Sequence, residues 1–167
     1  FLIFLFFLTI VSTISLPGLS IIAVLAGYIF GVFFGYLVVI IGLTLGSFLF
    51  FIFSKFFLKK LFFHYYMKYS ENLYRYIEKS SYEYLIIFRM IPGPPLFLQN
   101  TLLSLLGISN IKFIICTFIG LTPLNLAAVY IGNKIGNLQN IKKITIGEII
   151  TWDFLILIFI IIFLLII

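Results

Sequence analysis

The most constraining feature of this sequence is the length of its apolar runs. Residues 32–54 contain no charged side chain, and residues 111–132 and 148–167 are almost as apolar. About 20 apolar residues in a helix cross a hydrocarbon layer about 30 Å thick. Hydrophobic residues make up 63% of the chain and charged residues 10%, which is more apolar surface than one small soluble core can bury. The sequence therefore predicts an all-α integral membrane protein whose helices use lipid as their solvent.

Proline and glycine interrupt two other apolar segments before either is long enough to cross a membrane. Pro17-Gly18 separates residues 1–16 from residues 19–30, and Pro92-Gly93-Pro94-Pro95 separates residues 84–91 from residues 96–107. A continuous helix does not tolerate such breaks, and broken backbone survives at membrane depth only inside protein or beside a wet cavity. Each segment is therefore predicted to enter the membrane, turn and leave on the same side.

The two halves of the chain repeat the same order of segments. A predicted re-entrant hairpin at residues 1–31 precedes a transmembrane helix at residues 32–54, and a second hairpin at residues 84–110 precedes a helix at residues 111–132. Short, broken apolar segments at matching places in two halves are typical of inverted-repeat transporters with a central site. An alternative in which residues 1–16 cross the bilayer alone stays open, because that run nearly reaches the minimum of about 17 residues.

The remaining segments complete one predicted membrane domain over residues 1–167. Polar and aromatic stripes at helical spacing predict an amphipathic interfacial helix in residues 55–83, and residues 148–167 form a last transmembrane helix. Residues 55–83 carry six basic side chains and residues 132–147 carry three, so the first segment is predicted to be cytoplasmic. The expected location is the inner or plasma membrane, with several crossings and a cytoplasmic C-terminus.

Composition argues against several other classes of function. A net charge of +6 would suggest nucleic acid in a soluble protein, but here the basic residues flank apolar segments and set membrane orientation instead. The chain has one cysteine and one histidine, Cys116 and His64, which is too few for a metal site or a nucleophile–base pair. We therefore expect no enzyme activity, no cofactor or metal, and no nucleic acid partner.

Arg89 is the main candidate for a functional residue because it is a charge in an otherwise apolar arm. Such a charge costs about 2.5–3.5 kcal/mol on insertion scales, so it usually faces protein or a cavity. It could contact an anionic headgroup, or it could reach the interface or bind carbonyl groups freed by the break. The polar side chains after the break, Gln99 and Asn100, could likewise bind substrate or satisfy backbone. The following helix N-terminus favours an anion, and the turn itself adds Pro92, Gly93 and Pro95 to the candidate site.

Glycine and proline elsewhere have structural interpretations. Five glycines at four- and seven-residue spacings predict close helix packing: Gly27, Gly31, Gly35, Gly42 and Gly46. Pro17 and Gly18 form the expected tip of the first hairpin. Pro123, with Gly120 nearby, could be a hinge in a transmembrane helix, or the proline could simply be tolerated there.

Several stretches resemble the VTT-domain superfamily, also called the DedA or SNARE-associated Golgi protein superfamily, and in particular its Tvp-like bacterial branch. They are Leu16-Pro17-Gly18, Ala26-Gly27-Tyr28-Ile29-Phe30-Gly31, Phe88-Arg89-Met90-Ile91-Pro92-Gly93-Pro94-Pro95 with Asn100, Thr117-Phe118-Ile119-Gly120-Leu121-Thr122-Pro123, and Tyr130-Ile131-Gly132. The resemblance implies two facing re-entrant hairpins, an upstream first helix, and a role in lipid scrambling or in recycling polyprenyl-phosphate carriers. Arg89 falls on the family's arginine.

The sequence also departs from the family pattern. Pro95 stands where the DedA branch has a second arginine, Ser104 stands where a glycine is expected, and residues 16–54 contain no acidic side chain. Proton coupling of the DedA type is therefore not expected. The predicted function is movement of a lipid or lipid-linked anion, such as a phospholipid or polyprenyl phosphate, with membrane lipids as partners. The alternatives are a non-transporting membrane organiser that binds partners through residues 55–83, and a small-solute or ion transporter; a homo-oligomer is left open.

Overall fold

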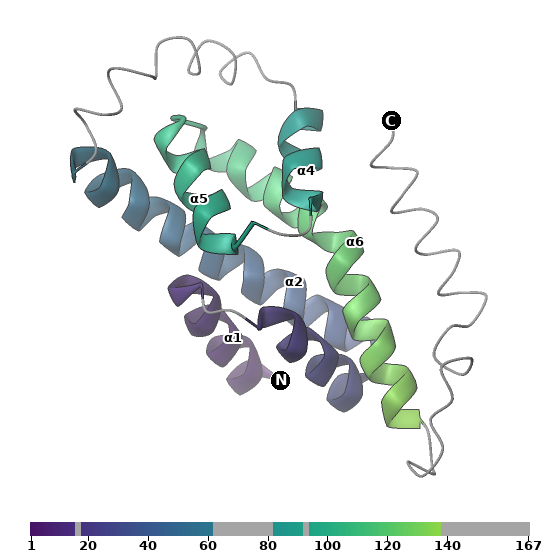
Figure 1. Ribbon diagram of the computed structural model, residues 1–167. Coiled ribbons are helices and arrows are strands. Elements are labelled where there is room, and N and C mark those ends of the chain that lie inside the picture. Colours follow the sequence, from purple (N-terminus) through teal and green to yellow (C-terminus); the bar gives the residue numbers. More distant parts are fainter. Residues whose placement is uncertain (16–17, 62–81, 92–93, 138–167) are drawn as a thin grey trace.

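The computed structural model describes residues 1–15, 18–61, 82–91 and 94–137, and within these ranges the chain is helical apart from short connections. The helices are α1 (Leu2–Ile14), α2 (Leu19–Leu61), α4 (Tyr82–Met90), α5 (Leu96–Leu105) and α6 (Asn110–Asn137), as Figure 1 shows. The predicted all-α class is confirmed for the described part of the chain. The predicted last helix, at residues 148–167, and most of the predicted interfacial helix lie outside the described residues.

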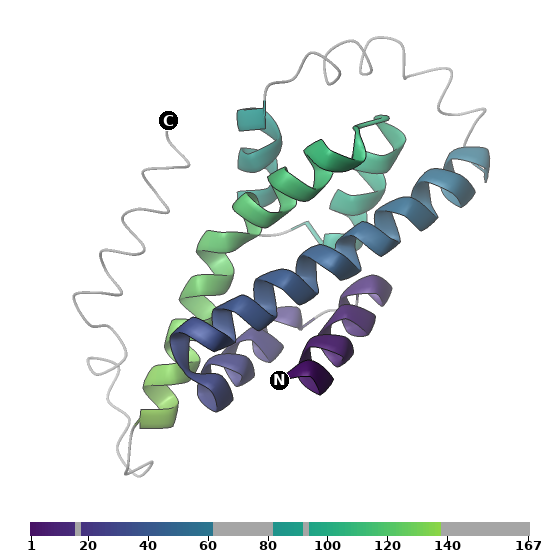
Figure 2. The same cartoon turned by 180° about the vertical axis from the view of Figure 1, so that it is seen from behind.

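Gly31 divides α2 into two helical parts. Its φ of 76° and ψ of −178° lie outside helical values, and residues 19–30 fold back along residues 32–61 (Figure 2). The fold-back is tight, because a Cβ on Gly35 would lie 2.8 Å from the Ala26 carbonyl oxygen. We expected Gly31 to be a packing glycine, but a Cβ there would meet only Asn133 Oδ1, at 3.8 Å. Its role is conformational, since glycine alone adopts such a positive φ at little cost.

The second half has the same order of elements as the first. Two short helices, α4 and α5, flank the proline-rich break, and Gly107, with φ of 72°, then leads into the long helix α6. In the first half α1 and residues 19–30 flank the break that ends at Gly18, and Gly31 leads into residues 32–61. A glycine with positive φ therefore precedes the long helix in both halves.

Both long helices extend beyond their predicted ends. We expected crossings at residues 32–54 and 111–132, but α2 ends at Leu61 and α6 at Asn137. Basic side chains near these ends lie over aromatic rings of the same helix, with Lys55 Nζ 5.7 Å from the centre of Phe51 and Lys134 Nζ 5.3 Å from the centre of Tyr130. A basic side chain can thus lie near the end of an apolar run while the helix itself continues past it.

The long part of α2 and α6 run antiparallel and form the centre of the molecule (Figures 1 and 2). At one end the rings of Phe51 and Phe113 stack with centroids 4.0 Å apart. Further along, Tyr36 Oη and Thr122 Oγ1 share a hydrogen bond of 2.8 Å. This pair of helices provides the frame against which all the short arms pack.

The first arm of each half packs on the long helix of its own half. In α1, Leu8 lies against Gly42, and Ser12 Oγ donates a hydrogen bond of 3.3 Å to the Leu43 carbonyl. In α4, Arg89 lies against Gly120 of α6.

The second arm of each half packs on the long helix of the other half. A Cβ on Gly27 would collide with the backbone of Val129 in α6, and a Cβ on Gly132 with the backbone of Val24. In the other direction, Ser104 of α5 is hydrogen-bonded through its hydroxyl to Ser54 of α2. The two halves are therefore interlocked through their second arms.

Two hydrophobic clusters form the core. The first core cluster joins α1, both parts of α2 and α6, and contains Leu8, Ala23, Ala26, Val38, Val39, Ile40, Leu43, Leu121 and Val129. The second core cluster joins the far end of α2 to the second hairpin and α6, and contains Phe51, Leu85, Leu103, Ile108, Phe113 and Cys116. The residues between these clusters form the candidate site.

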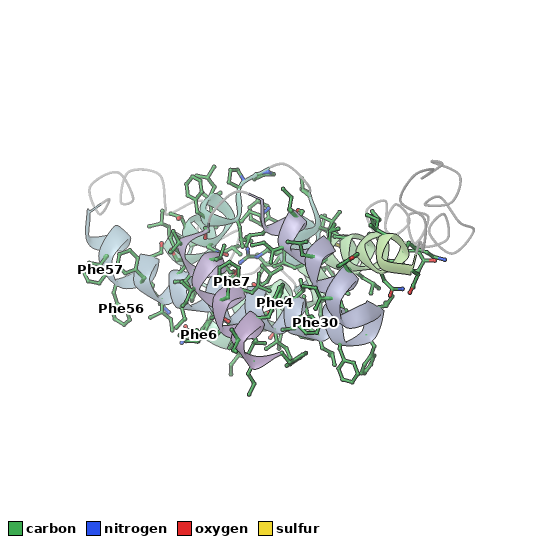
Figure 3. All side chains as sticks on the ribbon, turned by 90° about the horizontal axis from the view of Figure 1, so that it is seen from below. Phe4, Phe6, Phe7, Phe30, Phe56 and Phe57 are labelled. Carbon is green, nitrogen blue, oxygen red and sulfur yellow. The ribbon has the colours of Figure 1, made fainter. Side chains whose placement is uncertain are left out.

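The outer surface of the described helices is strongly apolar. Phe4 packs on Phe30, but Phe6, Phe56 and Phe57 point outward (Figure 3), and Phe6 and Phe56 are 68% and 72% exposed. Two described helices, α2 and α6, are long and apolar enough to cross a membrane. In α2 the uninterrupted apolar part is residues 32–57, about 39 Å of helix at about 1.5 Å per residue, because Gly31 interrupts the part before them.

Candidate functional site

Arg89 lies in the last turn of α4 and is enclosed by protein. Its side chain is 1% exposed, its guanidinium carbon is 4.7 Å from the centre of the Phe113 ring, and Nη1 donates to Gln99 Oε1 at 3.5 Å. The ring face offers a cation–π interaction, which is stronger where water is excluded. The guanidinium is thus held between α4, α5 and α6 rather than on the outer surface.

Gly120 leaves space for the Arg89 side chain because it has no Cβ atom. A Cβ on Gly120 would overlap the Arg89 Cβ and would lie 2.9 Å from the Ile86 carbonyl oxygen. Helix α6 remains helical through Gly120 and Pro123, and Asn125 Nδ2 donates to the Leu121 carbonyl at 2.7 Å. Gly120 is therefore a packing contact for α4. Pro123 does not end helix α6.

The guanidinium keeps two nitrogens without hydrogen-bond partners. Nε and Nη2 are buried and unpartnered, while Nη1 is the nitrogen that binds Gln99. Nε and Nη2 lie on one edge of the planar group, and their N–H bonds match the two oxygens of a carboxylate or phosphate. In its present surroundings this edge is unused, although leaving a buried donor unpaired costs about 1–3 kcal/mol or more for a charged group.

The two amides of α5 have different surroundings. Gln99 connects the arginine to the break, because its Oε1 accepts from Arg89 and its Nε2 donates to the Pro94 carbonyl at 3.3 Å. Asn100 is fully buried, yet neither its Oδ1 nor its Nδ2 has a partner. Pro95 is the N-cap of α5 and contributes no side-chain cap, so the first N–H groups of that helix are not capped by a side chain.

Three further buried residues have hydroxyl groups without hydrogen-bond partners, and the sequence did not identify them as site residues. Thr44 and Ser47 of α2 and Thr117 of α6 are buried, and their hydroxyl oxygens have no hydrogen-bond partner. A threonine in a helix commonly bonds the carbonyl four residues earlier, as Thr101 and Thr122 do here. From sequence, nothing distinguishes a hydroxyl that makes this local bond from one that does not, and so these three residues were missed.

The other predicted residues lie elsewhere. Gly27, Gly35, Gly42 and Gly46 are all buried at close contacts between helices, away from Arg89. Gly18, with φ of 94°, lies at the end of the first break, while Pro17, Pro92 and Gly93 are outside the described residues. Within the described ranges, no three His, Cys, Asp or Glu side chains lie close enough together to hold a metal ion.

The fold and the site together define an α-helical membrane protein with a charged side chain enclosed between two short, broken helices and a long one. The sequence profile of the VTT domain matches residues 16–134, which is more than half of the chain. The protein belongs to the VTT-domain family, that is, the DedA or SNARE-associated Golgi protein family of membrane proteins, as the resemblance in its sequence predicted. No solved structure matches the chain.

Proposed function

We propose that this protein moves a lipid or lipid-linked anion across the bilayer and that Arg89 binds the anionic group. The observation that carries the proposal is the unused Nε–Nη2 edge of a fully enclosed guanidinium. A charge inside a membrane protein marks a substrate pathway by default, since its insertion is costly and must be offset. Members of the VTT-domain family are often regarded as transporters or flippases, which agrees with this role.

Two basic residues on α6 support a position for the membrane along that helix. Lys112 Nζ is 5.2 Å from the centre of the Tyr82 ring, and Lys134 Nζ is 5.3 Å from the centre of the Tyr130 ring. Paired cationic and tyrosine side chains are typical of the interface. The helix between the two lysines rises about 33 Å, which fits a hydrocarbon layer about 30 Å thick.

With the membrane at these levels, the proposal makes the second hairpin re-entrant. Helix α4 begins with Tyr82 beside Lys112, and Arg89 lies against Gly120, about 12 Å deeper along α6. Helix α5 returns to the starting level, where Asn110 Oδ1 accepts a hydrogen bond of 3.5 Å from Lys55. The chain thus enters from the Lys112 side, turns inside the membrane and leaves on the same side.

The first hairpin opens toward the opposite side. Phe1 at the start of α1 packs on Phe30 and Phe34, and Gly31 lies beside Asn133 near the Lys134 end of α6. Opposite openings and interlocked second arms support an inverted repeat, the arrangement in which substrate sites lie at the repeat interface. The larger number of basic residues in residues 55–83 makes the Lys112 side cytoplasmic in this proposal, with the C-terminus also inside and the protein in the cell membrane.

In the proposed mechanism the protein lowers the barrier to an anion, and the lipid tails stay in lipid. The guanidinium edge binds two oxygens of a phosphate group, and the uncapped N-terminus of α5 adds favourable N–H groups. Because both hairpins turn inside the membrane, the apolar distance that the headgroup crosses is shorter than the full bilayer. A phospholipid and a polyprenyl phosphate share this anionic group and are both substrates under the proposal.

The test is a flipping assay with the purified protein in proteoliposomes that contain fluorescent phospholipid or polyprenyl phosphate. We expect Arg89→Ala to abolish flipping and the interfacial control Lys134→Ala to retain most of it. Equal flipping by wild type and Arg89→Ala would remove Arg89 from the mechanism. If neither protein moves lipid, the proposed function is wrong.

The arrangement of the hairpins has a separate test by cysteine labelling in a Cys116→Ser background. Gly18→Cys and Pro94→Cys lie beside the two breaks, and we expect slow, partial labelling of each by a membrane-impermeant reagent. The two positions should react from opposite sides of the membrane. Rapid labelling of both from one side contradicts the inverted repeat.

A further inference from the structure

A layer of buried polar side chains separates the two core clusters. On α2 it contains Thr44 and Ser47, which lie between Leu43 of the first cluster and Phe51 of the second. On α6 the layer contains Thr117, and on α5 it contains Asn100. All four side chains carry buried atoms without hydrogen-bond partners, as Arg89 does.

The contacts of α6 place Thr117 opposite the hydroxyls of α2. Phe113 stacks on Phe51 of α2, and Leu121 belongs to the cluster that contains Leu43 of α2. Thr117 is one turn from each of them on the same face of α6. It therefore faces the stretch of α2 between Leu43 and Phe51, and that stretch contains the two unpartnered hydroxyl groups.

The contacts of α5 place Asn100 at the same level. One turn after it, Ser104 is hydrogen-bonded to Ser54 of α2, and one turn before it, Leu96 packs on the first core cluster. Asn100 is buried and lies midway between them, so it faces α2 between Leu43 and Ser54. Its neighbour Gln99 holds Arg89 at this level through the hydrogen bond to Nη1.

The unpartnered groups of the layer are mostly donors. Arg89 offers Nε and Nη2, Asn100 offers Nδ2, and each hydroxyl can donate one hydrogen bond. Among the described residues the only acidic side chain is Glu83, which is exposed in the first turn of α4, a full turn or more from Arg89. A site rich in donors and built around one guanidinium suits an oxyanion.

We infer that Thr44, Ser47, Asn100 and Thr117 complete, together with Arg89, one internal site for a tetrahedral oxyanion, namely a phosphate group. The donors come from four different helices, so they approach the ligand from several directions, as the oxygens of a tetrahedral anion require. A planar carboxylate would use the guanidinium edge and leave most of the hydroxyls unpaired. The inference rests on the proposed function, whose anion it describes, and it assigns a binding role to three residues outside the arginine motif.

The test is a binding titration of the full-length protein purified in detergent, with inorganic phosphate in one arm and short-chain phosphatidylglycerol in the other. We expect Thr117→Val and Ser47→Ala each to weaken binding about tenfold, the loss of one hydrogen bond to a charged ligand. The control is Thr13→Val, because that hydroxyl bonds the Thr9 carbonyl in α1, and its affinity should stay within about twofold of wild type.

Thermal unfolding without ligand separates a binding role from a structural one. Thr117→Val removes a buried hydroxyl that has no partner, so its melting temperature should equal or exceed that of wild type. A structural role would instead lower the melting temperature and leave the affinity unchanged for the folded fraction. This measurement also establishes that the variants fold.

The outcomes separate this inference from the proposed function. Binding of inorganic phosphate that weakens in the hydroxyl variants supports the site, even if lipid is not flipped and the transport proposal fails. Binding of phosphatidylglycerol alone, with the same dependence, supports the site and identifies a lipid headgroup as the source of the phosphate. The inference is overturned if wild type binds neither probe, or if both hydroxyl variants bind the probes as wild type does, whether or not lipid is flipped.

Discussion

The two hairpins of this protein differ in how completely their buried polar side chains are hydrogen-bonded. In α1 and its C-cap residue Ser15 every hydroxyl has a partner. Thr9 bonds the Leu5 carbonyl, Thr13 the Thr9 carbonyl, Ser15 the Ser12 carbonyl, and Ser12 the Leu43 carbonyl of α2. In the second hairpin Arg89 and Asn100 are also buried, yet both keep unpartnered atoms. The first hairpin therefore uses its hydroxyl groups in packing and local hydrogen bonds, whereas the second keeps hydrogen-bond donors available for a ligand.

The largest loss of stability should come from adding a methyl group at the glycine against which each hairpin packs. A Cβ on Gly120 would overlap Arg89, and a Cβ on Gly46 would lie 2.7 Å from Ser12 Oγ. Overpacking of this kind costs about 1–3 kcal/mol, so both Gly120→Ala and Gly46→Ala should lower the free energy of unfolding by that amount. Unfolding of the purified proteins in mixed micelles with increasing SDS measures this loss.

The two glycine variants should differ in transport. Only Gly120→Ala displaces Arg89, so it should reduce lipid flipping well beyond any loss of folded protein, while folded Gly46→Ala should flip lipid as wild type does. Equal flipping by the two variants would mean that the hairpins are not specialised in the way proposed.

Smaller changes in the free energy of unfolding should have opposite signs in the two hairpins. Ser12→Ala removes a buried hydroxyl that is hydrogen-bonded to α2, and it should lower the free energy of unfolding by about 1 kcal/mol. Asn100→Leu removes an amide without partners at similar volume, so it should leave that free energy unchanged or raise it by about 1 kcal/mol. The same SDS unfolding measurement applies, and a large destabilisation by Asn100→Leu would contradict the absence of partners.

The last effect concerns Gln99, which connects Arg89 to the proline-rich break in the second hairpin. Gln99→Leu removes the hydrogen bonds to Arg89 and to the Pro94 carbonyl, which are long at 3.5 Å and 3.3 Å, and should cost about 0.5–1.5 kcal/mol. Thr13→Val in α1 removes one local bond and is the matched control. Lipid flipping should fall severalfold in Gln99→Leu alone, because Arg89 loses the amide that positions it.

Sequence patterns predicted the breaks and the charge more successfully than the details of the site. The arginine of α4 could be identified because a cation in an apolar arm is costly, and the breaks because proline cannot continue a helix. Gly31 was misinterpreted, since a four-residue spacing fits close packing as well as a turn, and only the backbone φ distinguishes the two. Thr44, Ser47 and Thr117 could not be found, because whether a helix hydroxyl makes its local bond depends on its rotamer and on its tertiary neighbours.

The place of Phe113 has a consequence for how an anion would affect the whole molecule. One ring stacks on Phe51 of α2 and also lies against the guanidinium of Arg89, so the charge and the contact between the long helices share a single side chain. An anion bound at the guanidinium would therefore lie beside the ring that joins α2 to α6, and any movement of that ring would reach both long helices.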